Sequence, residues 1–394
     1  MKQKHVILRA LGPTSDLEDL FLGPTARPAT VAKGVAVEIE LLNAAGVAEV
    51  SNRRDVIAHA PIMPLRLVEP LDTGVAAPAA LGVDWGVSAV GAPESPFDGQ
   101  GIVVAVLDTG IDTGHAAFQG VDLVTKNFTD EADADLHGHG THCAGSVFGR
   151  DVNGVRIGVA RGVGKALIGK VLAADGGGTD GIADAIEWAL REGANVISMS
   201  LGMDFPGYQK RLIDELGMPD EVATSAALEG YRLNITFFEK LAATVAAQAP
   251  FRQPAVILAA AGNESRTDED PDFKIAVAPP AVSGGIISVA ALGRSPVGLV
   301  PAPFSNIGAL VSGPGVAITS AKLGGGLVTM SGTSMATPIT AGVAALWAQK
   351  LNADGNLKPR TLEARVLASG TTAGFAPGFE PGDVGAGLVR APQS

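Results

Sequence analysis

The sequence of 394 residues has little cysteine and little charge. Its one cysteine, Cys143, cannot form a disulfide within the chain, so a disulfide framework is excluded. Charged residues make up 18% of the chain and hydrophobic ones 46%, which excludes a disordered protein. There are 29 basic against 41 acidic residues, and no basic cluster is longer than Arg53 and Arg54. This balance argues against a nucleic-acid partner.

An uninterrupted apolar segment is also absent from the beginning of the sequence. Charged residues interrupt positions 1–20, where a secretory signal needs an apolar core. We therefore expect no signal peptide and a cytoplasmic protein, with non-classical export left open. The uncharged stretch 323–349 is long enough to span a bilayer, but glycines and Pro338 interrupt it. We expect a packed segment there, and no membrane partner.

The residue pattern changes along the chain and predicts two domains. Residues 35–41 alternate apolar and charged side chains, as a half-buried strand does. We expect a small α+β N-terminal domain with its linker over residues 1–75, since 70–82 is rich in proline, glycine and alanine. The larger domain is expected over 76–394.

Four short apolar runs in the larger domain alternate with stretches of helical periodicity. Strands that are apolar on both faces belong to the middle of a parallel sheet covered by helices. The order predicts an α/β fold whose chemistry lies at the carboxyl ends of the strands. The runs are 102–107, 196–199, 256–260 and 286–289, and the helical stretches are 181–192 and 223–246.

Polar residues stand at the ends of these strands. Asp108 ends the first run, and Asn263 follows the run at 256–260. His139 lies in a glycine-rich segment, and Ser334 precedes a helical pattern of small residues. An acid, a histidine, an amide and a serine are the parts that an acyl-transfer enzyme needs. The serine needs a base, the base needs an orienting carboxylate, and the oxyanion needs preorganised donors.

The segments around these residues resemble the signatures of the subtilisin-like serine proteases, the subtilases. Their order is typical of that family, and the separations of 31, 124 and 71 residues between the four polar residues make chance a poor explanation. The segments are Asp108-Thr109-Gly110, His139-Gly140-Thr141-His142, Ala260-Ala261-Gly262-Asn263 and Gly332-Thr333-Ser334-Met335-Ala336.

The resemblance implies a subtilisin-like three-layer α/β fold with a central parallel sheet, and a serine endopeptidase. Ser334 would be the nucleophile, His139 the general base and Asp108 its orienting carboxylate. Asn263 would donate to the oxyanion. A protein or peptide substrate would add as an extended strand between two binding segments. These segments are Gly176, Gly177 and Gly178 on one side and Ser200, Leu201 and Gly202 on the other.

The same resemblance assigns a role to residues 1–75. A small domain before the catalytic unit often assists folding and fills the cleft until it is cut away, which here places cleavage between about Pro70 and Ala80. The alternative is a permanent regulatory domain. A competing class of function is a catalytically silent relative that binds peptides, although such a protein has no need of all four polar residues.

The sequence implies no cofactor for catalysis. Histidines at 137, 139 and 142 suggest zinc, but no second ligand cluster appears among the six histidines, so we expect no metal in the site. Structural calcium is possible in the family, but Ala116-Ala117 replace a common ligand motif. Cys143 resembles the cysteine beneath the catalytic histidine in the proteinase K branch; otherwise it is a small buried residue.

One part of the chain is longer than in compact family members. The residues between Gly202 and Asn263 include an expected helical insertion at about 203–252. It either rims the substrate cleft or is a solvated decoration of the surface. We expect a monomer.

Overall fold

The computed structural model describes residues 2–11, 34–71 and 82–394. An eight-stranded sheet forms the centre of the larger domain, in the order β15-β14-β13-β11-β6-β9-β7, with β16 beside β14. Its strand pairs are parallel except for β14 with β15. The strands are β6 (Val103–Asp108), β7 (Asp122–Asn127), β9 (Lys165–Lys170), β11 (Val196–Met199), β13 (Val256–Ala260), β14 (Ile286–Ser295), β15 (Gly298–Pro301) and β16 (Val311–Pro314).

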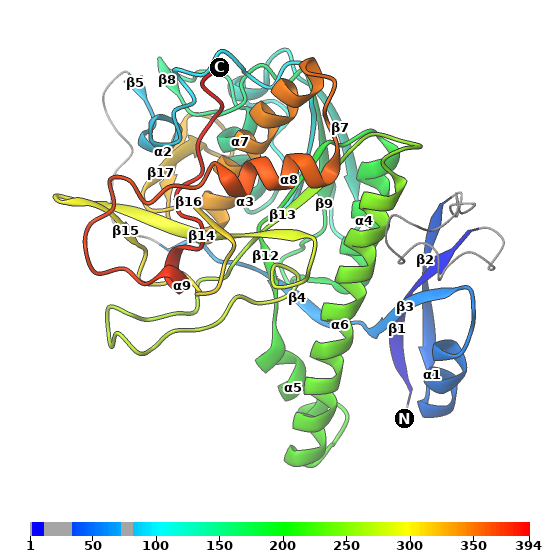
Figure 1. Cartoon of the computed structure of the whole chain (residues 1–394). Helices are drawn as coiled ribbons and strands as arrows, with labels where there is room; N and C mark the ends of the chain where they lie inside the picture. Colours follow the sequence, from blue (N-terminus) through cyan, green and yellow to red (C-terminus); the bar gives the residue numbers. More distant parts are fainter. Residues whose placement is uncertain (1, 12–33, 72–81) are drawn as a thin grey trace.

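Helices cover both faces of this sheet (Figure 1). Because side chains alternate along a strand, Val104 and Val106 of β6 join the core under one set of helices, whereas Ala105 and Leu107 join the other core. The predicted three-layer α/β fold with a buried parallel sheet is therefore confirmed. The first face carries α3 (His139–Phe148), α7 (Thr333–Ala353) and α8 (Pro359–Ala368), and the second carries α4 (Thr179–Arg191) and α6 (Asp220–Gln248).

The described N-terminal residues, 2–11 and 34–61, form a small antiparallel sheet with one helix. The strand order is β2-β1-β3, and α1 packs on one face. On the other face Val6 and Leu8 enter the same core as α4 and α6, while Ile7 points to the α1 side. The sheet thus docks on the larger domain through apolar burial. Its elements are β1 (Gln3–Ala10), β2 (Val35–Leu42), α1 (Ala44–Ser51) and β3 (Val56–Pro61).

The segment expected as an insertion forms α5 (Phe205–Asp214) and the long α6, which project together from the body of the molecule (Figure 1). The fully buried Asn234 of α6 links it to two other parts of the chain. Its Nδ2 donates to Pro61 O over 3.0 Å, and its Oδ1 accepts from Thr179 Oγ1 over 2.9 Å. The inserted helices therefore hold the end of β3 against the start of α4.

After β3 the chain continues into β4, which lies between β10 and β12 in a separate three-stranded antiparallel sheet. Residues 72–81, which contain most of the expected linker, lie outside the described residues. The remaining elements are short. The elements are β4 (Pro64–Leu67), β5 (Gly82–Val83), α2 (Trp85–Ala89), the 3-10 helix Ala116–Phe118, β8 (Val155–Arg156), β10 (Gly177–Gly178), β12 (Leu201–Met203), β17 (Ile318–Ala321), β18 (Leu327–Met330) and α9 (Pro381–Val384).

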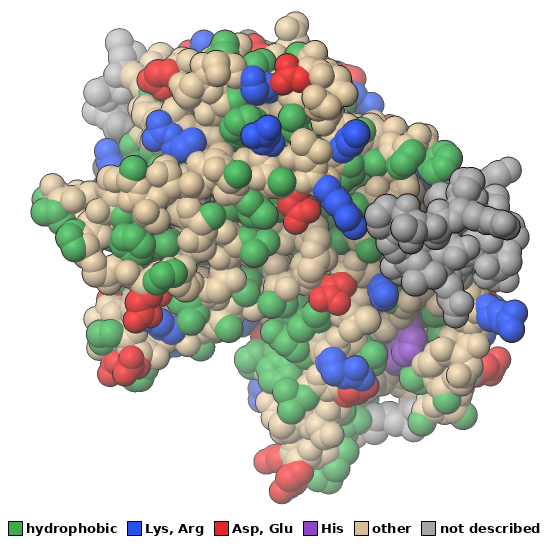
Figure 2. Space-filling model, in the orientation of Figure 1, with side chains coloured by type: hydrophobic (Ala, Val, Ile, Leu, Met, Phe, Trp, Pro, Cys, Tyr) green, Lys and Arg blue, Asp and Glu red, His purple; other side chains and the backbone are tan. Residues whose placement is uncertain are grey.

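The surface carries charges of both signs. On the face drawn in Figure 2, lysine and arginine side chains lie singly among acidic ones, and the α5–α6 projection leaves a notch beside the main body. Within the described part of the chain, no helix combines the length and the apolar character needed to cross a membrane.

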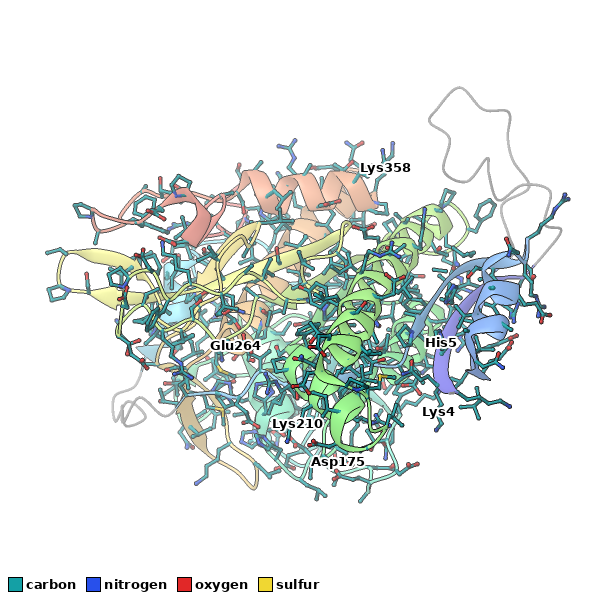
Figure 3. All side chains as sticks on the ribbon, turned by 90° about the horizontal axis from the view of Figure 1, so that it is seen from below. Lys4, His5, Asp175, Lys210, Glu264 and Lys358 are labelled. Atoms are coloured by element: carbon teal, nitrogen blue, oxygen red, sulfur yellow. The ribbon has the colours of Figure 1, made fainter. Side chains whose placement is uncertain are left out.

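Two neighbouring histidines lie within the N-terminal domain. His5 of β1 (Figure 3) is 5% exposed, and its ring centroid is 5.7 Å from that of His59 on β3. Burial, and then the neighbouring His59, lowers the pKa of His5 from 6.5 to about 4. Burial also lowers the pKa of His59. Both rings are therefore neutral in the folded domain at neutral pH.

We expect the N-terminal domain to lose stability as the pH falls from 6.5 towards 4. The unfolded chain binds a proton at His5 in this window and the folded domain does not, so stability present above pH 6.5 is lost on acidification. Hydrogen exchange of β1 and β3 in the Ser334→Ala chain, corrected for intrinsic rates, measures this loss. His5→Gln should reduce the effect and His137→Gln, at an exposed site, should not. Equal protection at pH 7 and pH 5 would contradict the expectation.

Candidate active site

Asp108 and His139 meet at the carboxyl edge of the central sheet. Asp108 is the last residue of β6, and His139 is the first residue of α3. Both are 0% exposed, and Asp108 Oδ1 lies 2.7 Å from His139 Nδ1. This distance is that of a strong, charge-assisted hydrogen bond. Such a bond orients the imidazole and directs its Nε2 away from the carboxylate.

The environment of His139 favours its protonated form. Burial by itself lowers the pKa of the imidazole, but the adjacent Asp108 carboxylate outweighs burial and holds that pKa well above its usual value. The neighbouring His142 shows the opposite result, because burial and then the charge of His139 lower its pKa to about 3. His142 contacts Ile318 O through Nε2, 3.1 Å away, and is a structural residue of α3.

Ser334 lies at the N-terminal end of α7. It is the second residue of that helix and 0% exposed, and its carbonyl oxygen accepts hydrogen bonds from Ser200 Oγ at 3.1 Å and Cys143 Sγ at 3.4 Å. Cys143 Sγ is also 3.7 Å from His139 Nδ1. Burial raises the pKa of the Cys143 thiol to about 11. The thiol thus packs between the histidine and the serine in its neutral form.

Asn263 presents its amide nitrogen to the site because its amide oxygen is already bound. Asn263 Oδ1 accepts hydrogen bonds from Thr333 N and Thr333 Oγ1, both at 2.9 Å. Gly262, with φ 113°, makes the turn that follows β13, and its N–H donates to Thr333 Oγ1. Thr333 is therefore a positioning residue for Asn263. It stands directly before Ser334, and sequence reasoning gave it no role.

A second positioning group that sequence reasoning missed is Asp135. This carboxylate is 3% exposed and accepts five hydrogen bonds, from Thr109 Oγ1, His137 N, Gly138 N, Thr141 N and Thr141 Oγ1. Burial raises its pKa, but the hydrogen bonds outweigh burial and lower it overall. Asp135 thereby ties the end of β6 to the first turn of α3.

Gly140 allows this close approach of α3 to the strand end. A Cβ atom at Gly140 would lie 2.2 Å from the backbone oxygen of Gly110. The same contact brings Gly140 N to Thr109 Oγ1, 2.9 Å away. A side chain at Gly140 would push His139 away from Asp108.

The chain itself passes through the site between the two segments predicted to bind substrate. Strand β4 pairs antiparallel with β12, with Gly202 opposite Arg66 and Leu201 opposite Leu67. On its other edge β4 pairs with Gly177 and Gly178 of β10. We call residues 64–71 the strap.

The other two predicted substrate-binding residues lie beside the strap. A Cβ atom at Gly176 would come 2.3 Å from the backbone oxygen of Leu65, so only glycine leaves room for the strap there. Ser200 bonds to Ser334 O rather than to the strap. Of the six predicted substrate-binding residues, five therefore line the strap and Ser200 supports the serine.

The strap brings two successive carbonyl groups to the polar side chains of the site. Ser334 Oγ donates to Val68 O over 2.7 Å, and Asn263 Nδ2 donates to Glu69 O over 2.9 Å. Beyond them Leu71 N donates to Ser331 O over 2.7 Å. Asn263 and Ser334 thus hold the strap by its backbone. The Asp108–His139 pair is linked to Ser334 through Cys143, whose Sγ contacts both His139 Nδ1 and Ser334 O.

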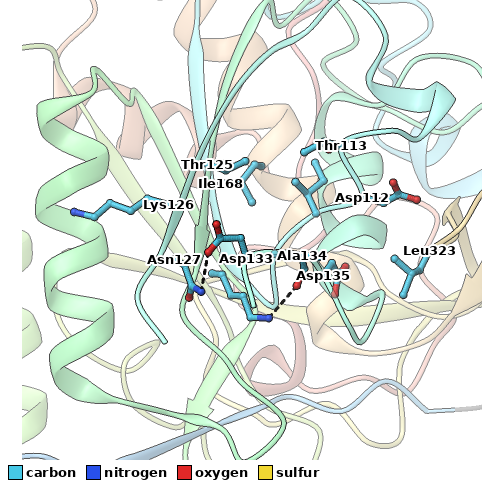
Figure 4. A pocket seen from close by; sticks show the side chains of 13 residues that line it. Asp112, Thr113, Thr125, Lys126, Asn127, Asp133, Ala134, Asp135, Ile168 and Leu323 are labelled. Carbon is cyan, nitrogen blue, oxygen red and sulfur yellow. Dashed lines mark hydrogen bonds between the residues drawn. The ribbon is translucent and has the colours of Figure 1, made fainter. Parts of the chain in front are cut away.

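A cavity of about 390 Å³ lies behind this edge of the sheet (Figure 4). Its wall carries Asp112, Asp133 and Asp135, but Asp133 bonds to Asn127 and Asp135 to the α3 turn. Among the described residues, the only cluster of His, Cys, Asp and Glu with ligand atoms within 4.8 Å of one another is Asp108, His139 and Cys143. The ligand atoms of that cluster already contact one another.

A parallel α/β sheet with a hydrogen-bonded carboxylate and histidine at its carboxyl edge, next to a serine at a helix tip, has the arrangement of a serine hydrolase. The chain belongs to the subtilase family, which residues 99–387 match. The predicted family is confirmed.

Curated proteins that are similar in sequence are also subtilisin-like proteases. The chain is 32% identical over 275 residues to subtilisin-like protease 6 of Trichophyton rubrum, and 33% identical over 275 residues to that of Arthroderma gypseum. Each match covers 66% of this chain and 57% of the relative, so the chain spans little more than half the length of these proteins. The names of the relatives support the predicted serine endopeptidase.

The expected cytoplasmic location is wrong. The relatives are fungal subtilisin-like proteases, which points to an extracellular location instead. The expectation rested on charged residues at positions 1–20, and these report only on one kind of targeting segment.

We expect Asp135→Asn to destabilise the protein and to slow turnover. An asparagine offers one acceptor oxygen where the carboxylate uses two, so buried donors of Thr141 or Thr109 lose their partner, at a cost of about 1–3 kcal/mol in unfolding free energy. Denaturant unfolding, with the substitution made in the Ser334→Ala chain, measures the loss of unfolding free energy. Peptide hydrolysis by the chain that keeps Ser334 measures turnover. The exposed Asp133→Asn is the matched control, and equal behaviour of the two variants would argue against a positioning role.

Proposed function

We propose that this protein is a serine endopeptidase that hydrolyses peptide bonds through an acyl-enzyme on Ser334. The observation that carries the proposal is that Ser334 and Asn263 hold the backbone of the strap, while the Asp108–His139 pair is linked to Ser334 through Cys143. Their side chains supply a base, a nucleophile and an oxyanion donor at the place where an extended peptide lies.

In the proposed reaction His139 takes the proton of Ser334 Oγ while that oxygen attacks the substrate carbonyl carbon. Asp108 stabilises the imidazolium, in keeping with the raised pKa of His139. The Asn263 amide and the Ser334 backbone N–H stabilise the oxyanion at the tip of α7. His139 then gives its proton to the leaving amine, and water releases the acyl group by the reverse sequence of transfers.

The competing function is a catalytically silent peptide binder. It is not favoured, because the relatives carry the name protease. A binder would also have no use for a buried Asp108 carboxylate whose Oδ1 bonds to His139 Nδ1 and accepts from Thr109 N.

Labelling with a fluorophosphonate tests the two functions against each other. The full chain should be modified at Ser334 once the cleft is free, and the Ser334→Ala variant should not react. Asn263→Ala should lower turnover by about 100- to 1,000-fold with little change in fold, which is the effect of removing one oxyanion donor. A folded chain that stays unlabelled and inert after the N-terminal domain has been cleaved off would leave only the binder.

We further propose that the N-terminal domain is an inhibitor that fills the cleft and is removed by self-cleavage. Its sheet shares a core with α4 and α6, and this docking delivers the strap to Ser334. A linker of a few residues gives the strap a high effective concentration at the site, so a separate substrate competes poorly.

The strap must shift before it can be cut. Attack requires the nucleophile and the oxyanion donor to serve the same carbonyl, whereas here Ser334 contacts Val68 O and Asn263 contacts Glu69 O. A shift that moves the Val68 carbonyl towards Asn263 would expose the Val68–Glu69 bond to attack. We therefore propose this bond as the cleavage site, slightly before the expected range of 70–80.

Intact-mass measurements over time test self-cleavage. The full chain should convert slowly to a fragment that begins at Glu69, while Ser334→Ala should keep its full mass. Weakening the docking with Leu8→Ala should speed the conversion, because the strap then leaves its resting register more often. A chain that reacts with fluorophosphonate yet keeps its full mass would instead be an enzyme with a permanent regulatory domain.

A further inference from the structure

The inserted helices place a carboxylate beside the strap. Asp204 follows β12 directly and caps the N-terminus of α5, where its Oδ1 accepts from Gly207 N over 3.0 Å. Its own N–H donates to Pro64 O over 3.0 Å. Asp204 Oδ1 lies 3.4 Å from Arg66 NH2, and the two side chains are 23% and 50% exposed.

The backbone pairing of β4, and not a contact of its own side chain, fixes the position of Arg66. Strand β4 is held on both edges, by β10 and by β12, and Arg66 stands opposite Gly202. Leu65 and Leu67, on either side of it, are buried at 1% and 9% exposure, so Arg66 turns outward to Asp204. A peptide bound in the same register would bring its corresponding side chain to the same carboxylate.

We infer that Asp204 is a specificity-determining residue that selects a basic side chain in the substrate, at the position opposite Gly202. The inference rests on the proposed peptidase function. The substrate class is an extended peptide with apolar residues where Leu65 and Leu67 lie and lysine or arginine between them. Asp204 contacts the substrate side chain only, and takes no part in the chemistry.

The other charges near this position do not neutralise Asp204. A cavity of about 300 Å³ beside Arg66 is lined by Glu131, Asp175 and Lys170 among others. Lys170 bonds to Glu131 over 3.1 Å. On α5, Lys210 bonds to Asp214 over 2.7 Å, and Figure 3 shows Lys210 and Asp175 at the same end of the molecule. When Arg66 is absent, Asp204 and Asp175 leave a negative charge at this position, which would attract a basic side chain.

A competition assay with the full chain tests this preference. Two internally quenched peptides, Pro-Leu-Xaa-Leu-Val-Ala-Ala with Xaa as arginine or glutamate, are hydrolysed in one tube. Cleavage after valine is followed by mass spectrometry. The ratio of the two rates does not depend on how many molecules have an open cleft. We expect the arginine peptide to be preferred about two- to fivefold, the range for an exposed ion pair, and less at 1 M salt.

Asp204→Asn is the informative variant, because asparagine still caps α5 while the charge is removed. It should bring the ratio close to one, and Asp204→Lys should reverse it. The matched control is Asp214→Asn, which removes an exposed charge from the same helix without a contact to the strap, and it should keep the preference. A ratio near one for the unchanged protein, or a preference that survives Asp204→Asn, overturns the inference.

A second measurement needs no catalysis and separates the inference from the proposed function. In the Ser334→Ala chain, hydrogen exchange of residues 64–71 reports the opening of the strap. Arg66→Gln and Asp204→Asn should each raise the equilibrium constant for opening of the strap about two- to fivefold. The double variant should raise it no further than either single variant. Additive effects overturn the inference even if peptides are cleaved. If the effects are coupled but neither peptide is hydrolysed, the recognition of a basic side chain by Asp204 stands and the proposed peptidase function is rejected.

Discussion

The hydrogen bond between Asp108 and His139 is the interaction on which the site depends, and two features of the fold create it. A parallel sheet ends β6 at the edge where α3 begins, and Gly140 lets the helix approach the strand without a side chain in between. Asp135 then holds the strand end and the helix start together. Within this frame the carboxylate overcomes the effect of burial and raises the pKa of the imidazole.

The contact between the two domains lies on the helices that cover one face of the sheet. The N-terminal sheet buries Val6 and Leu8 against α4 and α6, and the chain that leaves it pairs with β12 as β4. The same domain therefore makes both contacts, the apolar one with α4 and α6 and the polar one with Ser334. The inserted helix α6 belongs to this interface through Asn234, so the insertion is more than a surface decoration.

Much of the fold could be read from the residue pattern. The predicted helices at 181–192 and 223–246 correspond to α4 and α6, and the runs at 102–107, 196–199 and 256–260 to β6, β11 and β13. Periodicity reports which face of an element is buried, so it predicts such elements well. Strand β4 gave no such signal, because four residues are too few to show a period and its partners β10 and β12 lie far away in the sequence.

The sequence by itself indicated the side chains that we propose carry the chemistry, since Asp108, His139, Asn263 and Ser334 stand in segments typical of one family. It could not determine what supports them. Asp135 and Thr333 position the site through hydrogen bonds between residues that the fold brings together, and one-letter patterns do not encode such bonds. Only the tertiary structure decided that Val68 and Glu69 lie at the serine and the amide, because the register of a strap depends on the packing of a whole domain.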